Sequence, residues 1–220
     1  MSDLALYAHP FSSYCQKAFI AFYEKRVPFT MHVLSPENLQ AGEALSALWP
    51  FGRFPVLQAG TETIAESSII IEWLDQHYPA PHRLIPAEPE AALQVRLLDR
   101  VFDNYVMSPM QTIFGDRLRP ESARDPNGVQ QAHAMLDRAY AWLETTLAHH
   151  TWAAGADFTL ADCAAAPALF YARWSHDFTA YPALSAYYAR LLARPSFARC
   201  VEGGRPYRGF SPIPAPADCA

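Results

Sequence analysis

The sequence predicts an α/β domain with the element order βαβαββα, followed by an all-α domain. Short apolar runs with strand spacing alternate with helical periodicity as far as position 77, and after a proline-rich stretch only helical periodicity remains. The 220 residues, 51% of them apolar and 18% charged, are enough for two buried cores. This composition excludes collagen, coiled coil and extended disorder.

Periodicity predicts each element of the N-terminal half in turn. The apolar run Leu4 to Tyr7 predicts a strand, and apolar residues at helical spacing from Cys15 to Tyr23 predict a helix. Alternation over Pro28 to Leu34 is typical of a half-buried strand. The remaining elements are expected as a helix over 37–48, a hairpin with strands 56–58 and 61–64 joined by Ala59-Gly60, and a helix over 66–77.

The second half opens at the strongest linker signal in the chain, four prolines between positions 79 and 89. We expect a first domain over residues 1–80, a linker over 81–88, an all-helical domain over 89–202 and a Pro/Gly-rich tail over 203–220. The tail shows no period and is expected to lie over the surface or to be disordered. Pro109 should kink the helix that starts near Leu93.

Charge and cysteine usage exclude several kinds of partner. The net charge is −5, and the 17 basic residues, 15 of them arginine, are scattered, so no nucleic-acid surface is expected. The longest apolar run, Cys163 to Ala172, is about half of a membrane span, and no secretory signal opens the chain. The four cysteines form no CxxC pair, so we expect reduced thiols, no metal and a cytosolic protein.

The loop between the first strand and the first helix carries the segment Pro10-Phe11-Ser12-Ser13-Tyr14-Cys15-Gln16-Lys17. A helix start presents unpaired N–H groups and the positive end of the helix dipole, which stabilise a thiolate. A purely structural role is also consistent with the pattern, because Ser13 and Gln16 have the spacing of a capping box.

Two later segments are also consistent with either a binding role or a purely structural one. Gly52-Arg53-Phe54-Pro55-Val56-Leu57 places a proline at the first residue of a strand, where a missing N–H is tolerated. Ala65-Glu66-Ser67-Ser68 ends the hairpin and opens a helix, so hydroxyl and N–H groups are set where an anion can bind.

In this order, and followed by a helical domain, the three segments resemble the glutathione transferase family over nearly the whole chain. The resemblance implies a thioredoxin-like domain that binds glutathione. It also implies that Pro55 is cis, that the backbone of Val56 pairs with the cysteinyl residue, and that Ser67 and Glu66 hold the γ-glutamyl carboxylate and ammonium. Arg53 is a candidate partner for the glycyl carboxylate.

The second domain carries a further match, Phe158-Thr159-Leu160-Ala161-Asp162, which resembles a helix-start motif of the same family. Thr159 is expected to cap the helix and Asp162, as the third helical residue, to bond back to it. The local pattern and the resemblance both give this motif a structural role.

The residue that activates the thiol is expected to be Ser12. By the resemblance, it falls on the catalytic serine of theta-like and zeta-like members and on the catalytic cysteine of omega-like ones. Tyr7 is the second choice, because tyrosine classes carry their catalytic residue in the first strand. Cys15 is the third, since Ser12 to Cys15 is similar to the CPYC stretch of glutaredoxins with its first cysteine replaced.

The sequence also offers candidate residues for a second-substrate pocket and for a dimer interface. Phe11, Tyr105, Phe114 and Trp174 are candidate walls of a pocket for a hydrophobic electrophile. The charged rows Arg96-Arg100 and Asp99-Asp103 have i,i+4 spacing, and they suit either a homodimer face, as is common in the family, or a solvated helix face.

The resemblance thus implies a homodimeric glutathione transferase that adds the glutathione thiolate to a hydrophobic electrophile. Two alternatives stay open: a glutathione-dependent thiol reductase or isomerase, and a non-catalytic protein that only binds a ligand with this fold. A zeta-like isomerase fits less well, because the SSC stretch typical of that class stands here as SSYC.

Overall fold

A computed structural model describes residues 4–216 of the chain. Its N-terminal half has the predicted βαβαββα order and its second half is helical, so the predicted fold class is confirmed. The elements of the first half are β1 (Leu4–Ala8), α1 (Ser13–Glu24), β2 (Thr30–Val33), α2 (Leu39–Leu48), β3 (Val56–Ala59), β4 (Glu62–Ala65) and α3 (Ser67–His77).

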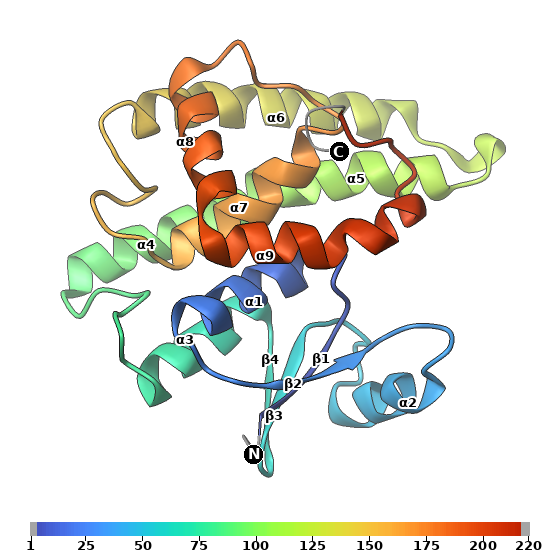
Figure 1. Cartoon of the computed structure of the whole chain (residues 1–220). Helices are drawn as coiled ribbons and strands as arrows, with labels where there is room; N and C mark the ends of the chain where they lie inside the picture. The colour runs from blue at the N-terminus through green and yellow to red at the C-terminus, as the bar shows by residue number, and fades with distance from the viewer. Residues whose placement is uncertain (1–3, 217–220) are drawn as a thin grey trace.

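The four strands form one mixed sheet in the order β2-β1-β3-β4 (Figure 1). β1 is parallel to β2 and antiparallel to β3, which pairs with β4 through a hairpin. Gly60 supplies the turn with φ 60°, a left-handed conformation that costs glycine little. The register places Tyr7, Val56 and Ala65 in one row across three strands.

The two faces of the sheet bury different residues because strand side chains alternate. Leu4, Leu6 and Ala8 point into the main core, which also holds α1. Ala5 and Tyr7 point to the other face, where a small cluster forms around Leu45 of α2. Accordingly, α1 and α3 lie between the sheet and the helical domain, and α2 lies on the outer side (Figure 1).

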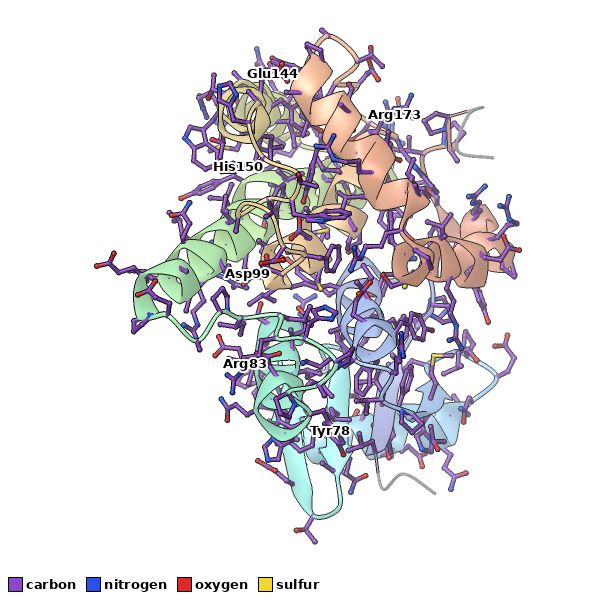
Figure 2. The ribbon with its side chains drawn as sticks, turned by 60° about the vertical axis from the view of Figure 1, so that its left-hand side comes forward. Tyr78, Arg83, Asp99, Glu144, His150 and Arg173 are labelled. Carbon is purple, nitrogen blue, oxygen red and sulfur yellow. The ribbon has the colours of Figure 1, made fainter. Side chains whose placement is uncertain are left out.

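The helical domain is built around α7, a helix in which every residue is buried. Its helices are α4 (Pro89–Val101), α5 (Ser108–Leu118), α6 (Pro126–Leu147), α7 (Leu160–Ala172), α8 (Pro182–Ala193) and α9 (Pro195–Gly204), with a 3₁₀ turn at Glu121–Ala123. The Glu144 carboxylate of α6 (Figure 2) accepts hydrogen bonds from the first N–H groups of α8, Ala183 and Leu184, both at 3.0 Å. Among the described residues, no helix is both long and apolar enough to cross a bilayer.

Pro109 shapes the junction of α4 and α5 through a π-helical segment, Phe102–Met107. A proline has no N–H for the carbonyl four residues back, so the regular ladder is interrupted there. The chain responds with a wider turn, in which the Ser108 N–H donates to the Asp103 carbonyl five residues earlier. The expected kink therefore takes the form of π-helical turns.

The C-terminal segment is more ordered than its composition indicates. α9 continues to Gly204, and Arg205–Phe210 forms a 3₁₀ helix, so residues 203–210 of the expected tail carry helical structure. A Cβ on Gly204 would lie 3.1 Å from Gln16 Nε2, so this segment packs closely on the first helix. Residues 217–220 of the expected tail, with Cys219, lie outside the described residues.

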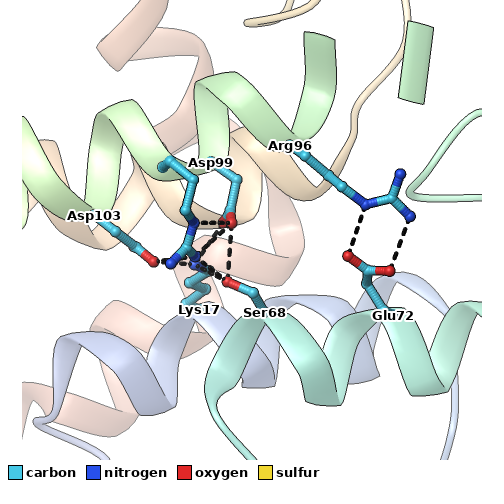
Figure 3. A network of polar contacts seen from close by, with 7 residues as sticks. Lys17, Ser68, Glu72, Arg96, Asp99 and Asp103 are labelled. Atoms are coloured by element: carbon cyan, nitrogen blue, oxygen red, sulfur yellow. Dashed lines mark hydrogen bonds and ion pairs between the residues drawn. The ribbon is translucent and has the colours of Figure 1, made fainter. Parts of the chain in front are cut away.

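A buried ion cluster joins the two domains (Figure 3). The Lys17 ammonium, fully buried on α1, lies 2.6 Å from Asp99 Oδ1 and 2.7 Å from Asp103 Oδ2. The Ser68 hydroxyl of α3 donates to Asp99 and accepts from Lys17, and Arg100 bonds to both carboxylates from the solvent side.

This cluster corrects one interpretation of the sequence. Asp99 and Asp103 do not belong to a solvated helix face, because both are buried against Lys17. Asp99 lies where α4 meets the first domain (Figure 2). Beside it, Arg96 and Glu72 form an exposed bidentate pair at 2.8 and 2.9 Å between α4 and α3 (Figure 3).

Candidate active site

Ser12 is the residue that caps α1. Its backbone is extended, its N–H donates to the His9 carbonyl at 3.0 Å, and its side-chain oxygen accepts from the Cys15 N–H at 3.4 Å. Ser13, which the capping-box pattern marks as the cap, is instead the first helical residue. The N–H groups of Ser13 and Tyr14 have no acceptor among the described residues, so the positive end of the helix lies beside the Ser12 hydroxyl.

Cys15 lies one turn further along the helix and is fully buried. Burial raises the pKa of its thiol to about 12, against the lowering effects of the Ser12 side chain and the His9 N–H. The His9 N–H lies 3.5 Å from the Cys15 sulfur. A buried neutral thiol of this kind is an inert packing group.

The loop before Ser12 is clamped onto the helical domain. Gln16 Nε2 donates to the Pro10 carbonyl at 2.9 Å and to the Tyr171 hydroxyl at 3.0 Å. The Tyr171 hydroxyl in turn donates to the Phe11 carbonyl at 2.9 Å. Gln16 thus faces inward and holds the loop, rather than taking part in a capping box.

The Tyr7 side chain points to the face of the sheet opposite the face covered by α1, the helix that Ser12 caps, because strand side chains alternate. Its ring is buried with Leu45 and Val56 on the face covered by α2, and it stacks on His32 with ring centroids 4.8 Å apart. The core residues of α1 lie on the opposite face.

The segment before β3 contains a cis peptide bond between Phe54 and Pro55. Val56 is paired with strands on both sides, opposite Tyr7 and Ala65, and its side chain is fully buried. Phe54 is exposed, and among the described residues its backbone N–H and C=O have no hydrogen-bond partner. Arg53 is exposed beside it.

Glu66 and Ser67 form the junction between β4 and α3. Glu66 has φ 69°, a left-handed conformation that costs a non-glycine residue about 1–2 kcal/mol. Such strain is often found at functional sites. The N–H groups of Ser67, Ser68 and Ile69 have no backbone acceptor in the described part of the chain, since the first helical bond runs from Ile70 to Glu66.

The sheet register brings the three segments to the same end of the sheet. Tyr7, Val56 and Ala65 form one row across the sheet, so the loop after β1, the bend before β3 and the turn after β4 all leave at the same end. Ser12, Phe54, Glu66 and Ser67 therefore surround one end of the sheet.

Three of the four candidate pocket walls come together. The Trp174 ring centroid lies 6.1 Å from that of Phe11 and 6.4 Å from that of Phe114. Tyr105 is not part of this group: it lies in the π-helical segment, half exposed, with no ring partner among the described residues.

Two tyrosines near the loop were not singled out from the sequence. Burial and the nearby Asp103 carboxylate raise the pKa of Tyr14 to about 12, against a hydrogen bond to Ser108. Tyr207, in the C-terminal 3₁₀ helix, lies edge-on to His9 with centroids 4.6 Å apart. Tyr14 stands inside the first motif and could have been found there, whereas no sequence pattern brings Tyr207 to His9.

The site offers no metal-binding cluster, since no group of three or more His, Cys, Asp or Glu side chains lies close enough to hold an ion in residues 4–216. What it presents is a helix N-terminus with a hydroxyl, a stretch of unpaired backbone and a second helix N-terminus beside a carboxylate. These groups can hold an extended peptide and a thiolate.

Comparison with known proteins defines the class. Residues 6–82 match the family "Glutathione S-transferase, N-terminal domain", and residues 126–190 match "Glutathione S-transferase, C-terminal domain". Glutathione S-transferase 3 of Zea mays is 30% identical over 212 residues, which are 91% of this chain and 94% of that protein. The chain belongs to the glutathione S-transferase family.

Two further relatives show the range of activities among similar proteins. A probable maleylacetoacetate isomerase of Vibrio cholerae is 28% identical over 214 residues, covering 94% of this chain and 99% of that protein. The crystal structure of a glutathione S-transferase from Methylobacillus flagellatus with glutathione bound superposes with a TM-score of 0.80 and 26% identity, covering 90% and 98% of the two chains.

Proposed function

We propose that this protein is a glutathione transferase in which Ser12 stabilises the thiolate of glutathione. The observation that carries the proposal is the convergence of the Ser12 loop, the Phe54 bend and the Glu66 turn at one end of the sheet. The family membership of the chain supports the same ligand.

Glutathione would lie across this end as an extended peptide. Its cysteinyl N–H and C=O pair with the unpaired backbone of Phe54, which takes the role first expected for Val56 because Val56 is enclosed between two strands. The γ-glutamyl carboxylate accepts from the Ser67 hydroxyl and the free N–H groups of α3, and its ammonium pairs with Glu66. Arg53, exposed beside the bend, is the proposed partner of the glycyl carboxylate.

The required activation is modest. A free thiol with a pKa near 8.5 is about 3% ionised at pH 7. Lowering that pKa to about 6.5 requires the site to stabilise the thiolate by roughly 2.7 kcal/mol, and it makes the thiol about three-quarters ionised. The Ser12 hydroxyl donates a hydrogen bond to the thiolate sulfur and keeps its own proton. The free N–H groups of Ser13 and Tyr14 add the positive field of the helix N-terminus.

The thiolate then attacks a hydrophobic electrophile that packs against Phe11, Phe114 and Trp174. A carbon–sulfur bond forms, and the leaving group departs with its electron pair. The thiol proton has already passed to solvent, so no side chain is needed as a general base.

A second candidate is an isomerase, which the 28% identity with the probable maleylacetoacetate isomerase favours. The same thiolate would add to a cis double bond, the resulting carbanion would rotate about the new single bond, and elimination would return the thiolate and the trans product. A thiol reductase based on Cys15 is not favoured, because its thiol is buried and its pKa is raised.

We also propose a homodimer. Leu93 and Leu97, one turn apart on α4, are 68% and 51% exposed, and Ile69 on α3 is 52% exposed. Apolar side chains exposed on two helices are typical of a surface that a second copy covers. The double variant Leu93→Glu/Leu97→Glu should elute as a monomer in size-exclusion chromatography with light scattering.

The test of function is the conjugation of glutathione to chlorodinitrobenzene, with kcat/KM as the measured quantity. Ser12→Ala should reduce kcat/KM by about 30-fold or more, since about 2–3 kcal/mol of thiolate stabilisation is lost. Cys15→Ser should retain activity. The reverse pattern would support the reductase, and binding of glutathione without turnover of chlorodinitrobenzene or of maleylacetoacetate would support a non-catalytic protein.

A further inference from the structure

His9 lies directly after β1 and is hydrogen-bonded to the residues that follow it. Its ring nitrogen Nδ1 accepts from the Phe11 N–H at 3.1 Å, and its carbonyl accepts from the Ser12 N–H at 3.0 Å. Its own N–H donates to the Cys15 sulfur at 3.5 Å. Both amide N–H groups that lead into Ser12 are therefore held by one residue.

The contact at Nδ1 requires a lone pair on that nitrogen. An amide N–H only donates, so the proton of the neutral His9 ring is on Nε2. Burial lowers the pKa of the His9 imidazole, which favours this neutral form. The contact has the same spacing as the turn in which an asparagine or aspartate side chain accepts from the N–H two residues on.

The other backbone groups of the loop have partners as well. The Phe11 carbonyl accepts from the Tyr171 hydroxyl at 2.9 Å, and the Pro10 carbonyl accepts from a side chain of α1. The Ser12 carbonyl accepts from an N–H of α1 at 2.9 Å. Of all these bonds to the loop backbone, the one at His9 Nδ1 comes from a side chain of the loop itself. Without it, the peptide group between Pro10 and Phe11 would be held on its carbonyl side alone.

The C-terminal 3₁₀ helix, Arg205–Phe210, packs against the His9 ring. The Tyr207 ring lies edge-on to it with centroids 4.6 Å apart, and the Phe210 centroid lies at 6.4 Å. Just before this helix, a Cβ on Gly204 would lie 3.3 Å from the Pro10 carbonyl oxygen. The imidazole is thus enclosed by rings that limit its rotation, which keeps Nδ1 directed at the Phe11 N–H.

We propose that His9 is a positioning residue for Ser12. Its Nδ1 acceptor holds the loop in the conformation in which the Ser12 hydroxyl meets the glutathione thiolate, and Tyr207 keeps the His9 ring in place. His9 acts through the loop and takes no part in the bond changes. The inference rests on the function proposed for Ser12, and it makes the C-terminal 3₁₀ helix a support of the active site.

The test compares His9→Asn with His9→Leu in the full chain. The two side chains have nearly the same shape, but only asparagine offers an acceptor to the Phe11 N–H. At saturating glutathione, the pKa of the bound thiol should stay near about 6.5 in His9→Asn and rise toward the free value of about 8.5 in His9→Leu. At pH 6.5, kcat/KM with chlorodinitrobenzene should be about tenfold lower in His9→Leu than in His9→Asn, as expected for one lost hydrogen bond.

Hydrogen exchange of the Phe11 amide, followed by NMR, reports on the loop independently of the chemistry. It should be at least about tenfold faster in His9→Leu than in the natural chain, because the amide has lost its acceptor, and it should stay slow in His9→Asn.

A second pair of variants tests the C-terminal segment without altering the loop, and it decides the matter if His9→Leu does not fold. Tyr207→Ala should lower kcat/KM about threefold or more, and in the His9→Asn background, which has no ring, it should have no further effect. Tyr78→Ala, which removes an exposed tyrosine ring just after α3, should change kcat/KM less than about twofold.

The outcomes distinguish this inference from the proposed function. An unchanged pKa of the bound thiol in Ser12→Ala would overturn both. Where Ser12→Ala does raise that pKa, three results would each overturn the inference and leave the role of Ser12 standing: equal thiol pKa values in His9→Leu and His9→Asn, an unchanged Phe11 exchange rate in His9→Leu, or an unaffected Tyr207→Ala protein.

Discussion

The side-chain oxygen of Ser12 lies 3.4 Å from the backbone nitrogen of Cys15, and this contact assigns the two residues opposite roles. It fixes Ser12 as the cap, at the partly exposed start of the helix. It also places Cys15 one turn inward, fully buried. A cysteine is intrinsically a stronger nucleophile than a serine, yet Cys15 is the residue that the fold withdraws from solvent.

The first prediction concerns Cys15 itself. Because burial raises its pKa to about 12, on the order of one molecule in ten thousand carries the thiolate at pH 8. Alkylation by iodoacetamide, followed by peptide mapping, should label Cys15 in urea but not in the native protein within hours. Labelling of the native protein within minutes would show that Cys15 is accessible and reopen the reductase alternative.

Much of this site could be predicted from the sequence, because its local patterns are strong. The alternation of apolar and polar residues and the helical spacing indicate the element order. The register of three short strands then brings the Ser12, Phe54 and Glu66 segments to one end of the sheet. The cap of α1 is Ser12 and not Ser13, one residue earlier than the capping-box spacing indicates, because serine is a favourable cap at either position.

Contacts between distant segments could not be predicted. A lysine such as Lys17 on an amphipathic helix is usually exposed, and only the tertiary structure shows that it faces two carboxylates, Asp99 of α4 and Asp103 of the π-helical segment. The same holds for Tyr207 and His9, which are brought together by a C-terminal segment that lacks any periodicity.

The second prediction concerns Lys17. Lys17→Met leaves the buried carboxylates of Asp99 and Asp103 with Arg100, on the solvent side, as their remaining cation, which should cost about 3–5 kcal/mol in the free energy of unfolding. Arg96→Gln, which breaks the exposed pair with Glu72, is the control and should cost about 1 kcal/mol or less. Urea denaturation at pH 8 measures both.

The cost of Lys17→Met should also depend on pH. Burial raises the pKa of Asp103 even with Lys17 present, and removing Lys17 raises it further. As the pH falls from 8 through this raised pKa, the folded state takes up a proton that the unfolded state does not bind until near its ordinary value of about 4, so the variant recovers stability. A deficit that is equal at pH 8 and pH 5 would argue against an uncompensated Asp103 charge.

The third prediction concerns Asp162, whose structural role matches the expectation from the motif. Its carboxylate is buried and accepts from the N–H groups of Ala153 and Thr159, at 2.7 and 2.8 Å, and from the Tyr187 hydroxyl at 2.7 Å. Asp162→Ala leaves these donors unpaired and should lower the free energy of unfolding by about 3 kcal/mol or more.

The exposed carboxylate of Asp157, in the loop before α7, supplies the control: Asp157→Ala should change stability by less than about 0.5 kcal/mol. Thermal and urea unfolding would be compared with the specific activity of the folded fraction. A stable Asp162→Ala protein that had lost only its activity would show that Asp162 acts in the chemistry rather than in the fold.

The most direct test of the account is the pKa of the glutathione thiol when it is bound, measured from the ultraviolet absorbance of the thiolate as a function of pH. With the natural chain the bound thiol should titrate near pH 6.5, and with Ser12→Ala, at saturating glutathione, its pKa should return toward the free value of about 8.5. A bound thiol whose pKa is the same in both proteins would contradict the role assigned to Ser12.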